Sequence, residues 1–387
     1  MKYSERIMNT PPSFTRRILA AAADPKIISF AGGLPHPASF PMEDLQASLD
    51  SVIGKYGDQL FQYATTPGFE PLRQYIADRY NKKHGLDITA DDVLITTGSQ
   101  QALDLIGKAV LDEGDGLIIE EPGYLGAIQA FSVYQPEFFT VPFEEHGLNI
   151  NELEKALENP HVKLIYTVPN FQNPSGLTYS KENRLEVAKA LEDKDVFLIE
   201  DDPYGDLRFR GEALPYIGVN NIEHGIFLGS FSKTITPGMR LGFVITRNKE
   251  LMNNINIAKQ ASDLHTSIFT QIVIYDYLTN NDYDGHIKKI IKMYGEQANT
   301  MLEAMDKYFP DYVKYTKPEG GMFIWATLPE GQSAMDLFHK AMAENVAFVP
   351  GNPFYVDKEN VNTLRLNYTN STDEMIIEGI KRLGSVL

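Results

Sequence analysis

Short apolar runs alternate with stretches of helical periodicity between residues 90 and 250. Apolar runs of this length, with polar turns after them, are typical of buried strands. The runs lie at residues 93–95, 117–119, 164–166, 196–199, 226–228 and 243–245, and the helical patterns between them include 100–110, 125–131 and 184–191. This alternation predicts a mostly parallel sheet covered by helices on both faces, a three-layer α/β/α fold.

The pattern changes after residue 285. A long helical stretch at 287–308 is followed by an apolar run at 321–325, a helical pattern at 335–344 and strand-like runs at 346–349 and 364–368. These features predict a smaller α+β domain. We therefore expect a large domain at 46–285, a small C-terminal domain at 286–387, and an N-terminal segment at 1–45 that packs near the small domain and the active site.

Composition and charge narrow the functional classes. The chain has 387 residues, enough for two domains, and a formal net charge of −17. Such an acidic chain is poorly suited to binding nucleic acid, which is held by an excess of Lys and Arg. The absence of cysteine excludes disulfides and thiolate catalysis. Without an apolar window long enough to cross a bilayer or a signal peptide, the sequence predicts a cytoplasmic protein with no membrane partner.

Polar motifs follow several of the predicted strands, at the edge where α/β folds bind ligands. After the first strand, Ser99 and Gln100 begin a helix, whose N-terminus suits a phosphate, although Ser99 is equally well explained as a helix cap. Tyr124 ends the next strand and can stack on an aromatic cofactor or simply pack in the core. Asn173 lies on a turn between Gln172 and Pro174, where ordinary turn chemistry also accounts for it.

Lys233 lies in the run GSFSKT at residues 229–234, seven residues before Arg240. A lysine amine can form an imine with an aldehyde. Ser230, Ser232 and Arg240 can hold the oxygens of a phosphate by hydrogen bonds and charge. A molecule that carries both groups is pyridoxal 5'-phosphate, the cofactor that this run predicts. A solvated surface loop is the alternative interpretation of the run alone.

Three acids end the strand at 196–199, in the sequence IEDDPY. A carboxylate facing a pyridine nitrogen keeps that nitrogen protonated, so that the ring withdraws electrons. Asp201 is a candidate for this role, and Tyr204, three residues later, for the phenolic oxygen of the same cofactor. The alternative, a metal site at Asp201 and Asp202, is disfavoured because no matching cluster recurs on the other strand ends, and no metal is predicted.

Arg365 lies inside an apolar strand, in the run NTLRL at 362–366. A buried cation needs a partner, and a carboxylate bound by two parallel hydrogen bonds suits a guanidinium best. The partner is either one of the chain's acids, as a structural ion pair, or the carboxylate of an amino-acid substrate.

Taken in this order, the motifs resemble the fold type I pyridoxal-phosphate enzymes, and among them the class I/II aminotransferases, from about residue 30 to the C-terminus. The nearest likeness is to the group of 2-aminoadipate, kynurenine and aromatic aminotransferases. The matching motifs are SFAGGLP at 29–35, TGSQQALD at 97–104, QNPSG at 172–176, SFSK at 230–233 and NTLRL at 362–366.

The resemblance implies a role for each candidate residue. Lys233 would hold the cofactor aldehyde and then carry the proton between the substrate α-carbon and C4' of the cofactor, Asp201 would pair with the ring nitrogen, and Tyr204 and Asn173 would bind the phenolic oxygen. Arg365, Asn173 and Gly33 would contact the substrate. Implied contacts of the ring and phosphate are Tyr124, Ser99, Gln100, Ser230, Ser232, Arg240 and, from a neighbouring subunit, Tyr63. A crossing Tyr63 implies a homodimer with active sites at the subunit interface.

The resemblance also implies a reaction: transfer of an amino group between an L-amino acid of aromatic, 2-aminoadipate or branched-chain type and a 2-oxo acid such as 2-oxoglutarate. Arg16, or Arg17 beside it, matches the position from which this group reaches the substrate side chain. A β-lyase or racemase on the same fold is one alternative. A non-catalytic regulator of the same fold is another, which the acidic charge disfavours.

Overall fold

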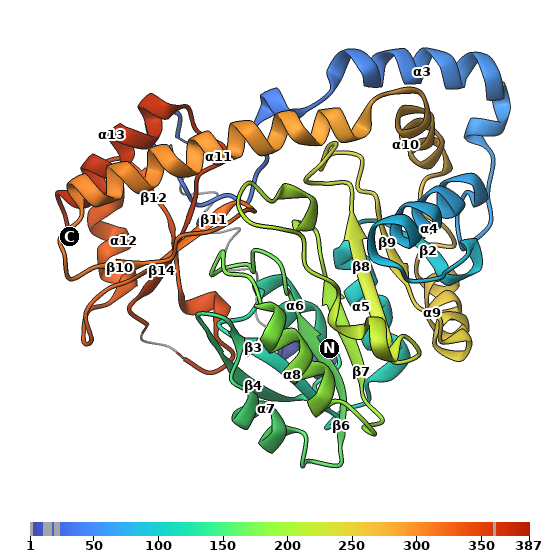
Figure 1. Cartoon of the computed structure of the whole chain (residues 1–387), viewed down its shortest axis with the longest axis horizontal. Helices are drawn as coiled ribbons and strands as arrows, with labels where there is room; N and C mark the ends of the chain where they lie inside the picture. Colours follow the sequence, from blue (N-terminus) through green and yellow to red (C-terminus); the bar gives the residue numbers. More distant parts are fainter. Residues whose placement is uncertain (1–2, 11–17, 19–23, 359–360) are drawn as a thin grey trace.

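The central element is an eight-stranded sheet in the order β2-β9-β8-β7-β6-β3-β4-β5 (Figure 1). In the computed structural model, which describes residues 3–10, 18, 24–358 and 361–387, β9 and β5 run antiparallel to the strands beside them. The strands of this sheet are β2 (Val93–Thr96), β3 (Gly116–Glu121), β4 (Glu137–Glu144), β5 (Gly147–Leu148), β6 (Val162–Thr167), β7 (Phe197–Asp201), β8 (Gly225–Ser230) and β9 (Gly242–Ile245). The predicted mostly parallel sheet is confirmed.

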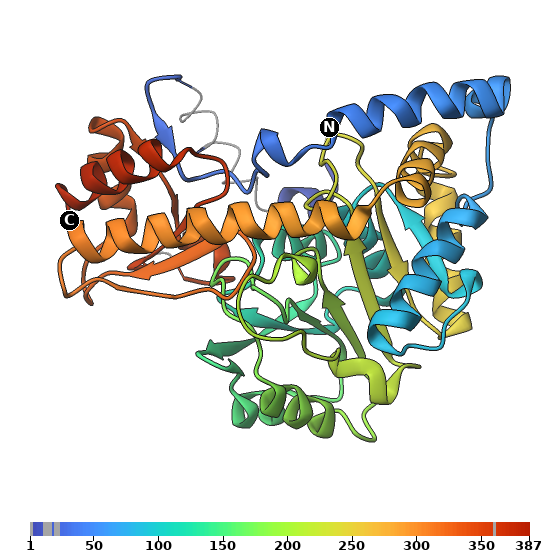
Figure 2. The same cartoon turned by 45° about the horizontal axis from the view of Figure 1, so that its top comes forward.

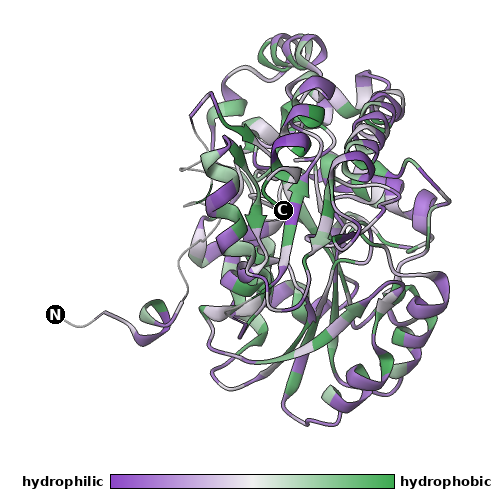
Figure 3. Cartoon of the chain, turned by 90° about the vertical axis from the view of Figure 1, so that its left-hand side faces the viewer, coloured by the Kyte–Doolittle hydropathy of each residue, from purple (hydrophilic) through white to green (hydrophobic). Residues whose placement is uncertain are grey.

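Helices cover both faces of the sheet. Successive residues of a strand point to opposite faces, so the apolar strands present apolar side chains on both faces. Leu117 and Ile119 of β3 join the cluster that contains helices α5, α6 and α9, whereas Ile118 joins the cluster with residues of α7 and α8. The α-helices between residues 42 and 280 are α3 (Met42–Tyr56), α4 (Glu70–His84), α5 (Ser99–Val110), α6 (Leu125–Ser132), α7 (Ile150–Ala156), α8 (Lys181–Ala190), α9 (Lys249–Ser262) and α10 (Ile268–Asn280). Figure 3 shows apolar strands inside and polar helix surfaces outside.

The C-terminal part is built on a second, antiparallel sheet of order β10-β11-β14-β13. The long helix α11 runs from the large sheet to this smaller one, as Figure 2 shows. The elements here are α11 (Tyr283–Tyr308), β10 (Lys314–Tyr315), β11 (Phe323–Thr327), α12 (Ala334–Ala343), β12 (Val346–Ala347), β13 (Val349–Pro350), β14 (Thr363–Asn367) and α13 (Asp373–Gly384). The strand expected at 346–349 is divided, since Val346 and Ala347 pair with β1 (Ile28–Ser29) whereas Val349 pairs with Arg365.

Residues 28–31 lie beside strands of the C-terminal part of the chain. α1 (Glu5–Met8) begins the described chain, and β1 pairs in parallel with β12. The amide of Asn367 donates to the carbonyl of Phe30, so residues 28–31 lie beside β14. Within the described residues, no helix is long and apolar enough to cross a membrane.

Candidate active site

The carboxyl ends of the parallel strands open on a cavity of about 350 Å³. Because β9 is antiparallel and Gly242 pairs with Ser230, Arg240 lies at this same edge although it precedes its strand. The predicted residues that line the cavity are Gly33, Ser99, Gln100, Tyr124, Asn173, Asp201, Tyr204, Ser230, Ser232, Lys233, Arg240 and Arg365. The fold thus brings together motifs from positions 33 to 365.

Lys233 is half-buried in the wall of this cavity, and its Nζ donates to the carbonyl of Gly33 at 2.7 Å. Burial, together with the positive charges of Arg365 and Arg240, lowers the pKa of Lys233 to about 8. A lowered pKa makes the neutral amine, the nucleophilic form, accessible near physiological pH. The surface-loop interpretation of the run is wrong for Lys233.

This pKa predicts how the capture of the cofactor depends on pH. The rate of imine formation between the protein and pyridoxal 5'-phosphate should rise with pH and reach half its maximum near pH 8, because the neutral amine gains population as pH passes the pKa of Lys233. Stopped-flow absorbance between about pH 6 and about pH 10 measures it. A midpoint at the ordinary lysine pKa of 10.5 would contradict the assignment.

Asp201 is buried, and strand alternation separates it from the acids on either side. Glu200 accepts from the amides of Ile217 and Gly218 at 2.8 and 2.7 Å, and Asp202 accepts from the hydroxyl of Tyr216 at 2.9 Å. The carboxylate of Asp201 turns to the other face of the sheet and lines the cavity. Of the three consecutive acids, Asp201 is therefore the one that a cavity ligand can reach.

One oxygen of Asp201 has no partner within the described residues. The hydroxyl of Tyr166 donates to Oδ2 at 2.8 Å, whereas Oδ1 is buried without a hydrogen bond. The pKa of Asp201 is raised to about 7, mainly by burial and also by the charge of Asp202, while the bond from Tyr166 opposes the rise. A buried acceptor without a donor is costly, so Oδ1 is suited to a ligand that brings a donor or a positive charge.

Removing the Tyr166 hydroxyl should therefore weaken the ionised form of Asp201. We expect Tyr166→Phe to lower kcat about tenfold to a hundredfold near pH 7, since a hydrogen bond to a charged group contributes about 1.5–3 kcal/mol. The defect should shrink as pH rises, because higher pH ionises Asp201 without the hydroxyl. Steady-state kinetics across pH tests this. Tyr179→Phe is the matched control, since Tyr179 donates to the buried Glu120 at 2.8 Å; equal pH dependence in both variants would contradict the role.

One end of the cavity is formed by the turn that starts α5. Gly98 has φ +76°, and a Cβ there would lie 2.6 Å from Nη2 of Arg240, so only glycine allows the guanidinium to approach the turn this closely. Ser230 and Ser232 line the same cavity, and the amide of Ser232 donates to Oγ of Ser230 at 3.1 Å. A helix N-terminus, two hydroxyls and an exposed guanidinium together suit a phosphate dianion.

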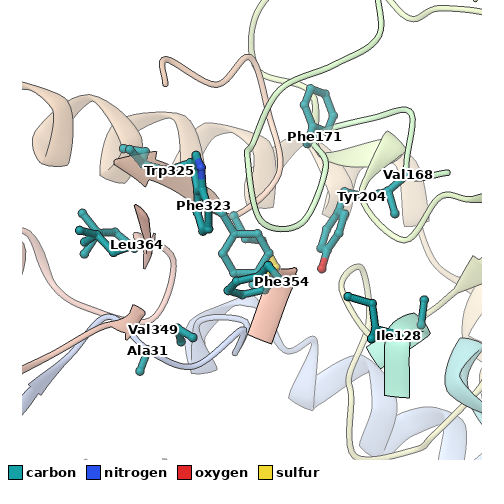
Figure 4. Packing of buried hydrophobic residues seen from close by; sticks show 14 of the residues in the cluster. Ala31, Ile128, Val168, Phe171, Tyr204, Phe323, Trp325, Val349, Phe354 and Leu364 are labelled. Carbon is teal, nitrogen blue, oxygen red and sulfur yellow. The ribbon is translucent and has the colours of Figure 1, made fainter. Parts of the chain in front are cut away.

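Arg365 is buried, with hydrogen bonds to neutral groups. Its Nη1 donates to Oδ1 of Asn173 at 2.7 Å and its Nη2 to the carbonyl of Ala31 at 2.9 Å. The guanidinium lies 4.3 Å from the ring centre of Phe323 and 5.1 Å from that of Phe354, and Figure 4 shows these rings close together, with Tyr204 beyond Phe323. Burial lowers the pKa of Arg365 to about 10. Among the described residues only neutral oxygens bind this buried cation, which favours the substrate-carboxylate interpretation over a structural ion pair.

The predicted Tyr63 does not line this cavity. Tyr63 is 81% exposed and contacts the ring of His265 edge-on, outside the cavity wall of its own chain. Arg16 and Arg17 lie outside the described residues. Tyr166 and Phe323 line the cavity from β6 and β11 but were not predicted as site residues. Both belong to apolar strands, and the only signal was their position near a strand end.

The comparisons with known proteins agree with this geometry. Residues 40–383 match the family model "Aminotransferase class I and II". This chain belongs to the class I and II aminotransferases. The aromatic-amino-acid aminotransferase 1 of Thermococcus litoralis is 41% identical over 100% of this chain and 94% of its own length. The predicted aminotransferase family, with its pyridoxal-phosphate cofactor and transaminase activity, is confirmed.

Solved structures extend the agreement to the fold of this aminotransferase. The kynurenine aminotransferase of Pyrococcus horikoshii superposes with a TM-score of 0.94 at 40% identity, covering 99% of this chain and 96% of that one. The α-aminoadipate aminotransferase of Thermus thermophilus, solved with N-(5'-phosphopyridoxyl)-L-leucine, gives a TM-score of 0.92 at 38% identity over 100% and 97% of the two chains. The predicted fold type I architecture is confirmed.

The residues of this aminotransferase fit pyridoxal phosphate. The unpartnered Oδ1 of Asp201 matches a protonated ring nitrogen, the amine of Lys233 matches the aldehyde, and the turn at Gly98 matches the phosphate. A cavity of about 350 Å³ is also of the size that small-molecule sites have.

Proposed function

We propose that this aminotransferase carries out its reaction with Lys233 as the proton carrier, Asp201 and Tyr204 as the residues that control the cofactor ring, and Arg365 as the substrate-carboxylate site. The convergence of these four side chains on one cavity is the observation that carries the proposal. Tyr124 would stack on the ring, and Asn173 would bind the phenolic oxygen with Tyr204. The phosphate would be held by Ser99, Gln100, Ser230, Ser232 and Arg240.

Bound pyridoxal phosphate supplies a ring that withdraws electrons and so stabilises negative charge at the substrate α-carbon. The protein's residues provide orientation and proton transfer. The neutral Nζ of Lys233 takes the proton from the α-carbon, and its lowered pKa keeps that neutral form populated. Ionised Asp201, supported by Tyr166, holds a proton on the ring nitrogen. Arg365 binds the α-carboxylate by two parallel bonds, with Gly33 beside it, and fixes which substituent of the α-carbon faces Lys233.

For the substrate we propose an L-amino acid of aromatic, 2-aminoadipate or branched-chain type, with a 2-oxo acid such as 2-oxoglutarate as acceptor. Two features support an apolar or aromatic side chain: the cavity wall contains Tyr124, Leu125 and Phe323, and relatives carry the names aromatic-amino-acid and kynurenine aminotransferase. The name of a third relative, α-aminoadipate aminotransferase, supports a side chain with a distal carboxylate. Arg16, which lies outside the described residues, stays the predicted contact for a distal carboxylate.

A donor panel tests this proposal. Aromatic, branched-chain and 2-aminoadipate donors are each assayed with 2-oxoglutarate, in the wild type and in Arg16→Ala and Arg17→Ala. We expect one or more of these classes to exceed alanine and aspartate in kcat/KM, and we expect Arg16→Ala to affect the 2-aminoadipate reaction selectively. Equal rates for all donors would contradict the substrate proposal, and release of pyruvate and ammonia from a donor would support the β-lyase alternative.

We also propose a homodimer in which the partner's Tyr63 completes the phosphate site. The exposed aromatic rings of Tyr63 and Phe61, 81% and 77% accessible in the single chain, support an interface at this segment. A cytoplasmic location, expected from the acidic charge, and the division into domains at 1–45, 46–285 and 286–387 remain proposals; the change from one sheet to another along α11 supports the division.

Subunit mixing should reveal the shared site. Tyr63→Ala and Lys233→Ala chains should each be impaired alone, but a mixed dimer contains one site with both native residues. We therefore expect activity to rise well above the average of the two parents after the variants are unfolded and refolded together. The control mixture contains Phe61→Ala in place of Tyr63→Ala. Phe61 is exposed beside Tyr63 and has no proposed phosphate role. Activity that never exceeds the parental average would contradict a crossing Tyr63.

A further inference from the structure

Lys259, on α9, is completely buried, which is rare for a lysine. Its Nζ donates to Oε1 of Gln101 at 2.9 Å, to Oδ1 and Oδ2 of Asp263 at 2.9 and 3.0 Å, and to Oγ1 of Thr266 at 3.0 Å. Burying a charge is costly unless hydrogen bonds and an opposite charge replace its contacts with water. The ammonium of Lys259 has both. None of the hydrogen bonds of the cluster of Lys259, Gln101, Asp263 and Thr266 involves Lys233. Burying the ammonium of Lys259 costs free energy, which points to a role of the cluster other than direct catalysis.

The cluster holds the turn that starts α5 at both of its ends. Gln101 also accepts from the amide of Thr97 at 2.8 Å and donates from Nε2 to Asp263 at 2.6 Å. Oγ1 of Thr97 lies 3.1 Å from Oγ1 of Thr266. Thr97 and Gln101 are the residues immediately before and after Gly98, Ser99 and Gln100, so the ammonium of Lys259 anchors the turn on both sides.

This turn leaves little room for displacement. Gly98 lies against the guanidinium of Arg240, and a Cβ on Gly242 would lie 2.8 Å from the backbone of Gly98 and Ser99. The turn is therefore packed between β9, Arg240 and the buried cluster. Small shifts of a site that binds through backbone N–H groups and one guanidinium reduce binding strongly, because those groups have fixed directions.

The same cluster extends to the segment of Tyr63. Asp263 is followed by Leu264 and His265, and Nε2 of His265 accepts from the amide of Ala64 at 3.2 Å. The buried cluster thus lies between the phosphate turn of its own chain and the segment that we assign to the partner's site.

We propose that Lys259 is a positioning residue for the cofactor phosphate, acting through Gln101 on the turn at residues 97–101. The inference rests on the proposed function, in which this turn binds the phosphate. Lys259 itself touches neither cofactor nor substrate. It fixes the direction of the N–H groups that do.

The phosphate itself gives a readout that a purely structural role would not change. Cofactor-free protein is titrated with pyridoxal 5'-phosphate and, separately, with pyridoxal, which has the same aldehyde and no phosphate; imine absorbance reports both affinities. Lys259→Met, which removes the charge and keeps the volume, should weaken the phosphorylated ligand at least about tenfold relative to pyridoxal. Gln101→Leu, which leaves the pair of Lys259 and Asp263 in place, should show the same selective loss if Lys259→Met fails to fold.

Asp92→Asn is the matched control. Asp92 is buried, accepts from Lys249 at 2.7 Å, and lies at the opposite end of β2, so it should lower stability without changing the ratio of the two affinities. The inference would be overturned if Gln101→Leu left the ratio of the two affinities unchanged from wild type, whether both affinities fell equally or neither fell. A wild type that forms no imine with either ligand would instead refute the proposed function.

Discussion

Lys233→Ala should abolish amino transfer, with a loss of kcat of at least about a thousandfold, since the proton-transfer role alone contributes about 10²–10⁴. The variant should also fail to form an imine with pyridoxal 5'-phosphate, because the lysine amine is the group that reacts with its aldehyde. Noncovalent binding should persist, since the phosphate contacts proposed for Ser99, Ser230 and Arg240 are untouched. Absorbance and single-turnover assays with an amino-acid donor measure both effects.

Stability should separate this loss from misfolding. The folded protein lowers the pKa of Lys233 from 10.5 to about 8, so the charged form is disfavoured in the folded state, and the penalty is present at every pH below the folded pKa. Removing the lysine should therefore not reduce the free energy of unfolding at pH 7. Lys340→Ala, at an exposed lysine of α12, is the control and should keep full activity. Retained turnover in Lys233→Ala would contradict its role.

Arg365→Ala should raise KM for amino-acid donors about a hundredfold or more while the cofactor stays bound. Two charge-assisted bonds to the substrate carboxylate are lost, and each contributes about 1.5–3 kcal/mol. The change also leaves Oδ1 of Asn173 and the carbonyl of Ala31 without their donor, and opens space beside Phe323 and Phe354. We therefore expect lower stability as well, measured by thermal unfolding.

A donor with and without its carboxylate separates the loss of substrate binding from the loss of stability. Arg365→Lys keeps the charge but not the planar fork, so its KM should fall between wild type and Arg365→Ala. A donor amine of the same side chain without the carboxylate should react slowly with all three proteins and at similar rates. If Arg365→Ala reduces the amine reaction as much as the amino-acid reaction, Arg365 is a structural residue and another group binds the carboxylate.

Much of the site could be predicted because parallel strands place their carboxyl ends together. Ser99, Asn173, Asp201 and Ser230 follow different apolar runs, and strand alternation assembles them at one edge without further information. The sequence and the family resemblance indicate Asp201 among three consecutive acids, but the physical reason needed the structure, since the partners of Glu200 and Asp202 show which face each occupies.

Other features depend on contacts that the local pattern does not contain. Lys259 lies on a helix whose sequence gives no sign that its ammonium is enclosed by Gln101 and Thr266. The bond from Lys233 to the carbonyl of Gly33 joins residues 200 positions apart. Strand β4 was missed because its residues are mostly half-exposed and do not form an apolar run. Long-range packing determines all three.

The most direct test is to locate the covalent cofactor. The holoenzyme is reduced with borohydride, which fixes an imine as a stable amine, digested, and the modified peptide is identified by mass spectrometry. The phosphopyridoxyl group should be on Lys233 alone, and prior incubation with an amino-acid donor in the absence of a 2-oxo acid should prevent the labelling, because the donor displaces the lysine. A label on another lysine, or a label on Lys233 that the donor does not reduce, would contradict the central claim that Lys233 is the catalytic residue of this aminotransferase.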